Sequence, residues 1–317
     1  MKDLILLLGR REDPHIRGIA KELQRMKEKF VLIDRFSRND SFIVKFDGSS
    51  SSLIKMGRHV IKTDEIKSVW NYSALQINVG KSIVKQARDF VLAEWTEGIA
   101  SLWRTIPAKW VNDPLATENA ANRLGQLQLA AKLGLNVPKT LVTNDPKSFQ
   151  DFYAECRGSM IAKTLHSSVG VPEGKMIFTT RMTERDLKRA EDLRHAPCMF
   201  QEYVPKTTEF RVTIVGENLH VAEIFSQRSR KTRDDWRRYD NFKKTPYVQS
   251  QLPNEVSKKL LKLMREMKLE YGAADLIKTP SDDFVFLEVN PNGRWWWVQE
   301  LTGMDITKSI AKHLSQR

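Results

Sequence analysis

The most chemically distinctive residues of this 317-residue chain lie near its C-terminus. Asp275 interrupts one apolar run (AADLI), and Glu288 and Asn290 interrupt another (FVFLEVNPNG). Because Glu288 and Asn290 are two residues apart, they would share one face of a strand. Three oxygen-bearing side chains on core strands are costly unless something neutralises them. Oxygen ligands without His or Cys suit Mg²⁺, although an edge strand that ends in solvent would show the same pattern.

Lys163 is a second unusual residue, because it interrupts an apolar, strand-like run, MIAKTL, at residues 160–165. A lysine in such a position needs an anionic partner, and a phosphate or a core carboxylate would each serve. The polar stretch HSSVGVPEG follows at 166–174, and its Ser, Gly and backbone N–H groups could lie over phosphates. A polar hairpin loop has the same composition, so this stretch alone does not decide between the two interpretations.

Two further segments carry polar residues in unexpected places. Glu202 and Glu209 interrupt the apolar patterns of QEYV and EFR, and Arg211 opens a strand. The segment 228–244 has eight basic residues against three acidic ones, with a tryptophan and a tyrosine among them. A solvated loop explains most charge runs, but basic residues with stacking rings also suit single-stranded RNA.

The composition narrows the classes of protein to which the chain can belong. Its net charge of +13 favours an anionic partner such as nucleic acid, a membrane surface, a nucleotide or an acidic polypeptide. No stretch approaches the roughly 18 apolar residues that a membrane helix needs. Two cysteines, Cys156 and Cys198, cannot staple a fold of this size, and they fit the reducing cytoplasm. The six histidines show no close pair, and GxSxG, P-loop and GxGxxG motifs are absent, which disfavours zinc, serine-hydrolase and dinucleotide sites.

The first part of the chain is typical of an α/β unit. Residues 3–8 form a continuous apolar run, as expected for a strand buried on both faces. Asp13 followed by Pro14 predicts a helix start, with a capping carboxylate before a proline at the first helical position. The serine run at 49–52 predicts a loop, with a hairpin around it. A long helical pattern occupies residues 81–103.

The pattern changes after Pro107 and Pro114, and we place a domain boundary between them. A single helix is predicted over 117–134, closed by Gly134. After residue 155 the order is strands, helix, strands, helix, strands, which indicates an α+β fold with antiparallel sheet.

Taken in order, these segments resemble the ATP-grasp superfamily from about residue 111 to residue 305. IAKTL resembles its nucleotide-binding lysine strand, FQEYV its adenine hinge, and DLI and FLEVNPNG its paired magnesium strands. The resemblance implies an α/β N-terminal (pre-ATP-grasp) domain followed by an α+β ATP-grasp fold with antiparallel sheets. The units expected are the N-terminal domain at 1–110, a central subdomain at 111–190 and a C-terminal subdomain at 191–317.

The same resemblance implies the cofactors ATP and Mg²⁺ and a role for individual residues. The implied ligands are Lys163 for the α- and β-phosphates; backbone groups of Glu202, Tyr203 and Val204 for adenine; Glu209 for ribose; Asp275, Glu288 and Asn290 for Mg²⁺; and Arg211 with one of Arg237 or Arg238 for the γ-phosphate and the tetrahedral intermediate.

Within the superfamily, the chain resembles the microviridin-type (graspetide) peptide macrocyclases, which are relatives of the ribosomal-protein glutamate ligases. NRLGQLQLAAKLG, VAEIFSQRS and FLEVNPNGRWWW carry this likeness. It implies ATP-dependent joining of side chains within an acidic precursor peptide, made of a leader and a core, to give esters or amides. The chain departs from this subgroup in two places. Trp70 is followed by NYS, where the subgroup commonly has a basic pair. Three tryptophans (295–297) follow NPNG, and we expect one or two of these three to belong to the core.

Several points stay open at the level of the sequence. Asp234, Asp235 and Glu300 are guesses for a general base. The basic residues of 228–244 are expected to form a mobile flap over an acidic substrate segment. Two rival functions remain: a glutamate or other amino-acid ligase that modifies a protein or small peptide, and a non-catalytic basic protein that binds nucleic acid. The sequence favours the peptide over nucleic acid as the partner, predicts no membrane contact, and leaves a homodimer open.

Overall fold

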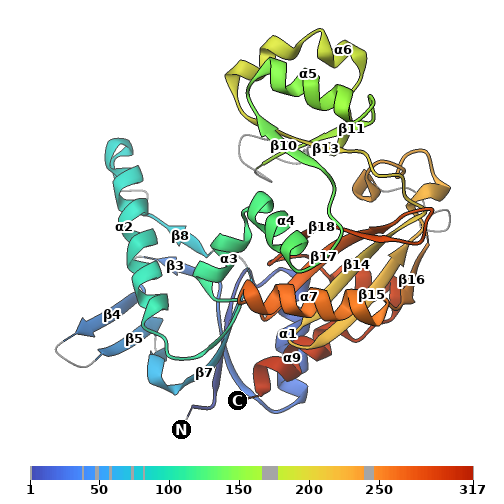
Figure 1. Cartoon of the computed structure of the whole chain (residues 1–317). Helices are drawn as coiled ribbons and strands as arrows, with labels where there is room; N and C mark the ends of the chain where they lie inside the picture. Colours follow the sequence, from blue (N-terminus) through green and yellow to red (C-terminus); the bar gives the residue numbers. More distant parts are fainter. Residues whose placement is uncertain are drawn as a thin grey trace.

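The computed structural model describes residues 2–37, 39–46, 50–56, 59–72, 75–80, 83–165, 178–238 and 246–316. The chain forms an N-terminal domain, a central lobe and a C-terminal sheet (Figure 1). The central lobe stands above the C-terminal sheet in this view, while the N-terminal domain lies below and beside it. The candidate site residues are distributed over the last two of these units.

A parallel sheet forms the centre of the N-terminal domain, with the strand order β2-β1-β7-β9. The buried residues of β1 confirm the strand predicted from the apolar run. The helix start at Asp13 is also confirmed, since the Asp13 carboxylate accepts a hydrogen bond from the His15 amide. These elements are β1 (Leu4–Leu8), α1 (Pro14–Arg25), β2 (Lys29–Ile33), β7 (Ile66–Asn71) and β9 (Lys109–Val111).

Two small sheets and a long helix extend this domain to one side. The hairpin expected around the serine run is present, but β5 begins at Ser50, so much of that run is strand rather than loop. The physical reason is cross-strand pairing with β4, and the buried Ser52 hydroxyl also bonds the Thr105 hydroxyl at 2.8 Å. The elements are β3 (Arg35–Ser37), β4 (Ser41–Phe46), β5 (Ser50–Met56), β6 (His59–Lys62), η1 (Thr63–Glu65), β8 (Gln76–Asn78) and α2 (Lys85–Arg104).

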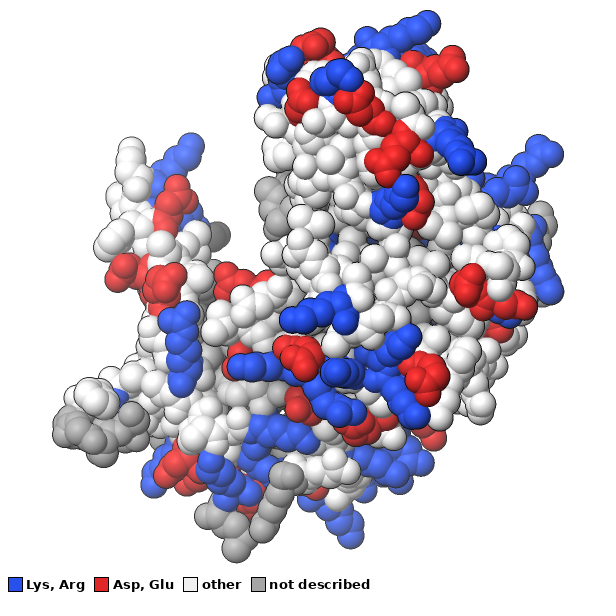
Figure 2. Space-filling view, viewed as in Figure 1, with Lys and Arg blue, Asp and Glu red and all other residues white. Residues whose placement is uncertain are grey.

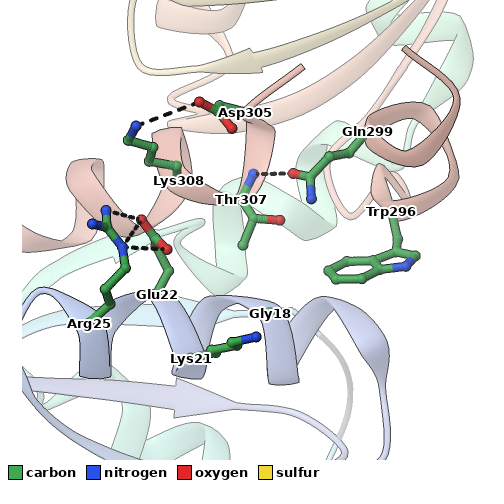
Figure 3. Close-up of a pocket in the computed structure, with 9 residues that line it drawn as sticks. All are labelled: Gly18, Lys21, Glu22, Arg25, Trp296, Gln299, Asp305, Thr307 and Lys308. Atoms are coloured by element: carbon green, nitrogen blue, oxygen red, sulfur yellow. Dashed lines mark hydrogen bonds and ion pairs between the residues drawn. The ribbon is translucent and has the colours of Figure 1, made fainter. Parts of the chain in front are cut away.

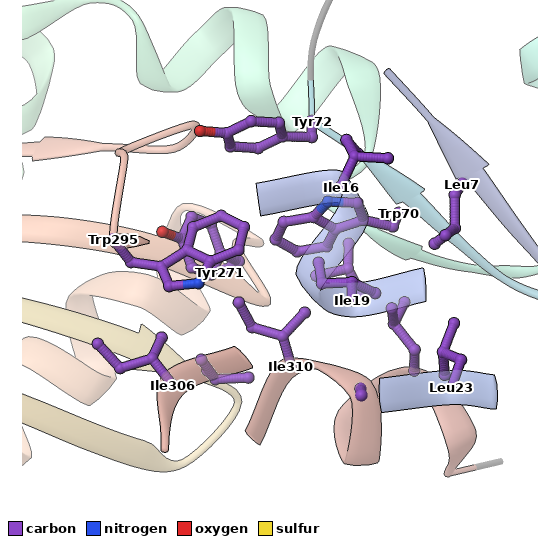
Figure 4. Close-up of a cluster of buried hydrophobic side chains, with 14 of the residues drawn as sticks. Leu7, Ile16, Ile19, Leu23, Trp70, Tyr72, Tyr271, Trp295, Ile306 and Ile310 are labelled. Atoms are coloured by element: carbon purple, nitrogen blue, oxygen red, sulfur yellow. The ribbon is translucent and has the colours of Figure 1, made fainter. Parts of the chain in front are cut away.

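The last helix, α9 (Ile306–Ser315), returns to the N-terminal domain and packs beside α1, so both termini lie at the bottom of Figure 1. Figure 4 shows the core at this junction, in which side chains of α1, β7, β17 and α9 meet around Trp295. Trp295 is fully buried, in agreement with the expectation that one or two of the three tryptophans are core. Trp70 is also buried in this cluster, so its ring packs inside the protein.

The prediction of a single helix over 117–134 is wrong, because the structure has two helices there: α3 (Pro114–Ala120) and α4 (Arg123–Lys132). The Asn122 side chain accepts a hydrogen bond from the Gly125 amide at 3.0 Å and thereby starts α4 anew. Gly134, at φ +80°, adopts the left-handed conformation directly after α4, as expected.

The central lobe is an antiparallel sheet of order β10-β13-β11-β12 covered by α5. The strand β13 pairs with β10 and β11, so this unit extends to Glu202, and the boundary predicted between 190 and 191 would cut through it. Its elements are β10 (Thr140–Thr143), α5 (Pro146–Glu155), β11 (Met160–Lys163), β12 (Thr180–Arg181), α6 (Glu184–Leu187), η2 (Ala190–His195) and β13 (Cys198–Glu202).

The C-terminal sheet is antiparallel throughout, with the strand order β16-β15-β14-β17-β18. Helix α7 packs its Leu260, Leu263 and Met264 against one face, which leaves the alternate residues of β14, β17 and β18 on the other. The elements are β14 (Thr208–Val215), β15 (Asn218–Ile224), η3 (Ser226–Arg228), η4 (Trp236–Arg238), β16 (Tyr247–Ser250), α7 (Asn254–Glu266), β17 (Tyr271–Lys278), β18 (Phe284–Asn290) and α8 (Trp296–Thr302).

In the part of the chain that the structure describes, no helix combines the length and apolar character that a membrane crossing requires.

Candidate active site

Three neighbouring strands of the C-terminal sheet place a row of charged side chains on the face opposite α7. Arg211 of β14 is directly across from Asp275 of β17, which is directly across from Glu288 of β18. Directly paired residues project to the same face of a sheet, so the row is continuous. The Arg211 guanidinium bonds both carboxylate oxygens of Asp275, with Nη1 at 2.9 and 3.0 Å. Arg123, at the start of α4, completes the row with its Nε 3.1 Å from Glu288 Oε2.

The two carboxylates of this row differ in their electrostatics. Burial raises the pKa of Asp275, and the Arg211 charge offsets only part of that shift. Burial would also raise the pKa of Glu288, but Arg123, Lys163 and Arg237 together bring it below its usual value. The cations around Glu288 therefore hold it in its anionic form.

Asn290 lies at the end of β18, where the chain turns sharply. Its Oδ1 accepts a hydrogen bond from the Asn292 amide at 3.0 Å, and its carbonyl accepts one from the Gly293 amide at 3.1 Å. A Cβ at Gly293 would lie 2.3 Å from the Ala273 Cβ, so only glycine allows the turn to rest on the sheet beside Arg211.

These residues fit a magnesium ion by the chemistry of their donors. Asp275, Glu288 and Asn290 offer oxygen atoms alone, and Mg²⁺ takes one or two carboxylates while keeping water and phosphate oxygens in its shell. Among the described residues, no group of three or more His, Cys, Asp and Glu side chains is arranged to hold a metal.

Lys163 ends β11 in the central lobe, and its charge interacts with those of Glu288 and Arg123 in this row. Burial lowers the pKa of its ammonium group, and Glu288 acts in the opposite direction. Arg123 also bonds the carbonyl of Thr164, so one arginine contacts both the Lys163 strand and Glu288. Arg123 was assigned no role from the sequence, where it appears only as one more basic residue of a helix. The 166–174 stretch falls within the residues 166–177 that are outside the described part of the chain.

The segment predicted to bind adenine and ribose joins the central lobe to the C-terminal sheet. The amide of Glu202 donates to the Lys139 carbonyl at 3.0 Å, and that of Tyr203 donates to the Ser159 carbonyl at 2.8 Å. Among the described residues, the Val204 amide has no backbone acceptor. The Glu202 and Tyr203 amides are thus already engaged within the protein.

Glu209 is buried at the start of β14, with Lys206 as its partner at 3.0 Å. Burial raises the pKa of the Glu209 carboxyl, and the Lys206 charge opposes this shift. Lys206 was also assigned no role from the sequence. Its position three residues before Glu209, in an otherwise uncharged stretch, was the available signal.

The basic segment after β15 forms hydrogen-bonded turns as far as residue 238, and a flap of this segment over the substrate stays a prediction. The Thr232 hydroxyl donates to the Ser226 carbonyl at 2.7 Å, and the Gln227 side chain donates to the Arg233 carbonyl at 2.9 Å. The Trp236 ring is 8% exposed and lies 5.0 Å from the Trp297 ring, so it has no free face for a nucleic-acid base. Tyr239, Lys243 and Lys244 lie outside the described residues.

Arg237 and Arg238 emerge from this folded segment with different partners. Asp235 holds Arg237 in a bidentate pair at 2.6 and 2.9 Å and also accepts from the Thr179 amide at 3.0 Å. Burial would raise the pKa of Asp235, but Arg237 keeps it below its usual value. Arg238 donates to the Thr179 carbonyl at 3.2 Å.

The three guesses for a general base are all engaged elsewhere in the structure. Asp235 orients Arg237 with both of its oxygens. Asp234 accepts from Arg181 at 3.0 Å, and Glu300 accepts from the Trp296 indole at 2.7 Å. Asp235 is thus placed to position Arg237 rather than to take a proton.

Comparison with known proteins agrees with this geometry. The model of the RimK-like ATP-grasp domain matches residues 120–314, which is more than half of the chain. This chain belongs to the RimK-like ATP-grasp family. The ATP-grasp ligase class and the antiparallel ATP-grasp fold expected from the sequence are therefore confirmed.

Curated relatives of this RimK-like ATP-grasp chain are distant in sequence. It is 23% identical to a probable alpha-L-glutamate ligase of Klebsiella pneumoniae over 203 residues, or 63% of this chain and 65% of that protein. It is 22% identical to a ribosomal protein bS6–L-glutamate ligase of Escherichia coli O81 over 210 residues, or 65% of this chain and 67% of that protein. The match thus spans about two thirds of each relative.

Solved structures match this RimK-like ATP-grasp chain over nearly its full length. One is a RiPP-associated ATP-grasp ligase of Chryseobacterium gregarium, in complex with ADP and a leader and core peptide, at a TM-score of 0.90 and 25% identity, covering 98% of this chain and 96% of that one. Another is the macrocyclase MdnC of Microcystis aeruginosa MRC, bound with precursor peptide MdnA, at 0.83 and 28%, covering 98% and 99%. The expected resemblance to peptide macrocyclases is confirmed, and it includes the N-terminal domain.

Proposed function

We propose that this chain uses ATP to activate side-chain carboxylates of an acidic precursor peptide and joins them to hydroxyl or amine side chains as esters or amides. The observation that carries the proposal is the Arg211–Asp275–Glu288 row, with which the Lys163 charge interacts. A carboxylate does not acylate an alcohol or amine unaided, because oxide is a poor leaving group. Transfer of the γ-phosphoryl group gives an acyl phosphate, and the incoming hydroxyl or amine then displaces phosphate.

The residues of the site have distinct tasks in this scheme. Asp275, Glu288 and Asn290 would hold Mg²⁺, which when bound neutralises charge on the β- and γ-phosphates. Lys163 binds the α/β end of the nucleotide, and the Glu202–Val204 backbone and Glu209 bind adenine and ribose. Arg211 and Arg237 stabilise the charge that develops on the transferring phosphoryl group and on the tetrahedral intermediate. Asp235 fixes the Arg237 fork in the required orientation.

An acidic peptide also fits the charge of the chain. The net charge of +13 raises the encounter rate with an anionic segment in a salt-dependent way. On the face seen in Figure 2, both signs of charge are interspersed over α7 and the central lobe, and the surface is hollowed between α2 and that lobe. A single basic patch of the kind that suits nucleic acid is not visible on this face.

The nucleotide role of Lys163 gives a direct prediction. We expect Lys163→Met to weaken ADP binding by about tenfold or more, because it removes a charge-assisted contact to phosphate while keeping the length of the side chain. Isothermal titration calorimetry measures the change. Lys139→Met is the matched control in the same lobe, since Lys139 is exposed and pairs with Glu155. Equal ADP affinity in the two variants would contradict the assignment.

Arg230, Lys231 and Arg233 are exposed on the folded segment and give a second prediction. Reversing all three to glutamate should weaken binding of a labelled acidic peptide by about tenfold at low salt, with ADP affinity unchanged, since each exposed contact contributes about 0.2–1 kcal/mol. The loss should shrink at high salt, because the Debye length falls from about 10 Å at 0.1 M to about 3 Å at 1 M.

The control for this reversal has the same change in charge on the opposite side of the sheet. Lys258, Lys262 and Arg265 are exposed on α7, which covers the face away from the site. Their reversal should leave the peptide affinity near that of the wild type. If both triple variants lose the same affinity, net charge alone attracts the peptide and the folded segment has no specific role.

A second candidate function is suggested by the glutamate ligases among the curated relatives. Mass spectrometry separates the two functions when the chain is incubated with an acidic peptide that contains Thr, Ser or Lys, together with ATP, Mg²⁺ and free glutamate. Crosslinking removes one water for every bond closed and needs no glutamate. Ligation of glutamate raises the peptide mass and depends on it. An unchanged peptide mass, with glutamate present and absent, would oppose both functions for that peptide.

A further inference from the structure

The turn that follows Asn290 is held in place by residues from distant parts of the chain. We call residues 291–296 the Asn290 loop. Asn112 donates from its amide to the Pro291 carbonyl at 2.9 Å, and the Tyr271 hydroxyl donates to the Gly293 carbonyl. The same Asn112 side chain bonds the backbone of Tyr271, so the loop and the start of β17 share one anchor.

His15 of α1 contacts the other end of this loop. Its Nε2 lies 3.2 Å from the Trp295 amide and 3.2 Å from the Trp296 amide, and its Nδ1 lies 2.7 Å from Asp13 Oδ1. Backbone amides can only donate, so Nε2 must be the acceptor and the ring proton must be on Nδ1, where Asp13 accepts it. The ring is thus fixed in one tautomer with its lone pair directed at the start of α8.

The surroundings of the ring favour this neutral form. His15 is 5% exposed, with its ring centroid 4.3 Å from that of Trp295 and 5.1 Å from that of Tyr72. Burial lowers the pKa of the imidazole, the Asp13 carboxylate opposes this shift, and the Arg294 charge adds to it. A neutral imidazole satisfies two buried amides that would otherwise lack a partner.

Packing on the far side of the loop reinforces the same contact with α1. Figure 3 shows the Trp296 ring over α1 at Gly18, beside a pocket of about 380 Å³ between α1, α8 and α9. A Cβ at Gly18 would lie 2.5 Å from Trp296 Cζ3, so a larger residue would displace the ring. The loop is therefore seated on α1 by a hydrogen-bonded imidazole on one side and a glycine contact on the other.

We propose that His15 is a positioning residue, which holds the Asn290 loop against the N-terminal domain and so fixes Asn290 where it serves the magnesium site. Asn290 is joined to the loop both by the chain and by its own hydrogen bonds to the Asn292 and Gly293 amides. Displacement of the loop therefore moves the Asn290 amide oxygen. The consequence for nucleotide binding rests on the proposed function, whereas the hold on the Trp295 and Trp296 amides does not.

Hydrogen–deuterium exchange of the ligand-free protein tests the structural part. His15→Phe keeps a ring among Tyr72 and Trp295 but removes the acceptor, so peptides that cover 295–296 should exchange about tenfold faster or more, the scale of one lost hydrogen bond. His15→Gln retains an acceptor near the position of Nε2 and should preserve most of the protection. In His15→Asn the side chain is too short for its oxygen to reach the two amides, so this variant should behave like His15→Phe.

A matched control separates this effect from a general loosening of the domain junction. Ser68 donates to the Leu314 carbonyl at 2.7 Å, another buried contact between the N-terminal domain and the C-terminal part of the chain. Ser68→Ala should leave exchange at 295–296 unchanged. Equal exchange in wild type and His15→Phe, or equal acceleration in His15→Phe and Ser68→Ala, would overturn the proposal. If His15→Phe fails to fold, the comparison of His15→Gln with His15→Asn replaces it. Equal exchange at 295–296 in these two variants would then overturn the proposal.

The functional part is measured as the affinity for ADP over a range of Mg²⁺ concentrations. His15→Phe should require several-fold more Mg²⁺ for half-maximal binding, and Ser68→Ala and His15→Gln should resemble the wild type. Faster exchange without any change in the Mg²⁺ requirement would overturn the link to Asn290. If wild-type ADP binding is itself independent of Mg²⁺, the magnesium assignment fails, and the exchange result still decides the role of His15 in holding the loop.

Discussion

Glu288→Gln should reduce ATP-dependent crosslinking by at least about a hundredfold while the fold stays intact. Glu288 is the carboxylate whose pKa three basic residues hold down, so its charge is available to an ion at neutral pH. The substitution keeps the shape of the side chain, and an amide oxygen can take the place of Glu288 Oε2, which lies 3.1 Å from Arg123 Nε. It removes only the negative charge, and loss of one preorganised electrostatic contact typically costs this much in rate.

The control for this substitution is Glu223→Gln on the same sheet. Glu223 lies on β15 across from Phe210 and accepts from the Ser250 hydroxyl at 3.1 Å, on the face that α7 covers. It should retain near-normal turnover. Circular dichroism and thermal unfolding should show both variants folded. Near-normal turnover of Glu288→Gln at saturating Mg²⁺ would remove Glu288 from the site.

Arg211→Ala should lower both stability and activity. Arg211 is buried and neutralises Asp275 through two short contacts, so its removal leaves a buried carboxylate without a partner. Breaking such a pair costs about 3–5 kcal/mol in the free energy of unfolding. Urea unfolding measures the loss. Burial already raises the pKa of Asp275 and removal of Arg211 raises it further, so protonation should relieve part of the loss as the pH falls.

A double variant separates the two effects of Arg211. Arg211→Met combined with Asp275→Leu removes both members of this buried ion pair, and much of the stability should return. The double variant should nevertheless stay inactive, because both the ligand of the ion and the arginine of the phosphoryl site are gone. Recovery of turnover together with stability would show that the pair is structural and that the chemistry lies elsewhere.

The charged row could be predicted from the sequence because successive side chains of a strand project to opposite faces of the sheet. Asp275 and Glu288 stand out in apolar runs, and a period of two fixes the face on which each projects. The capped starts of α1 and α5 were equally accessible, since Asp followed by Pro is a local signal. Resemblance to a family added the order of the motifs and the nucleotide roles.

Contacts between segments far apart in the chain could not be predicted in this way. Arg123 reaches Glu288 from 165 residues away, and His15 reaches Trp295 across 280. No local pattern distinguishes either residue from an ordinary basic residue of a helix. The helix break at Asn122 was missed because helical periodicity continues through it, and the boundary at residue 190 was misplaced because β13 pairs back into the central sheet.

Transfer of heavy oxygen tests the central claim most directly. An acidic peptide is prepared with heavy oxygen in its Asp and Glu side-chain carboxylates and incubated with the chain, ATP and Mg²⁺. Because the proposed acyl phosphate leaves one carboxylate oxygen on phosphate, one labelled oxygen should appear in inorganic phosphate for each ester or amide bond formed, and the peptide should lose one water per bond. Crosslinked peptide accompanied only by unlabelled phosphate would contradict activation of the side-chain carboxylate by ATP.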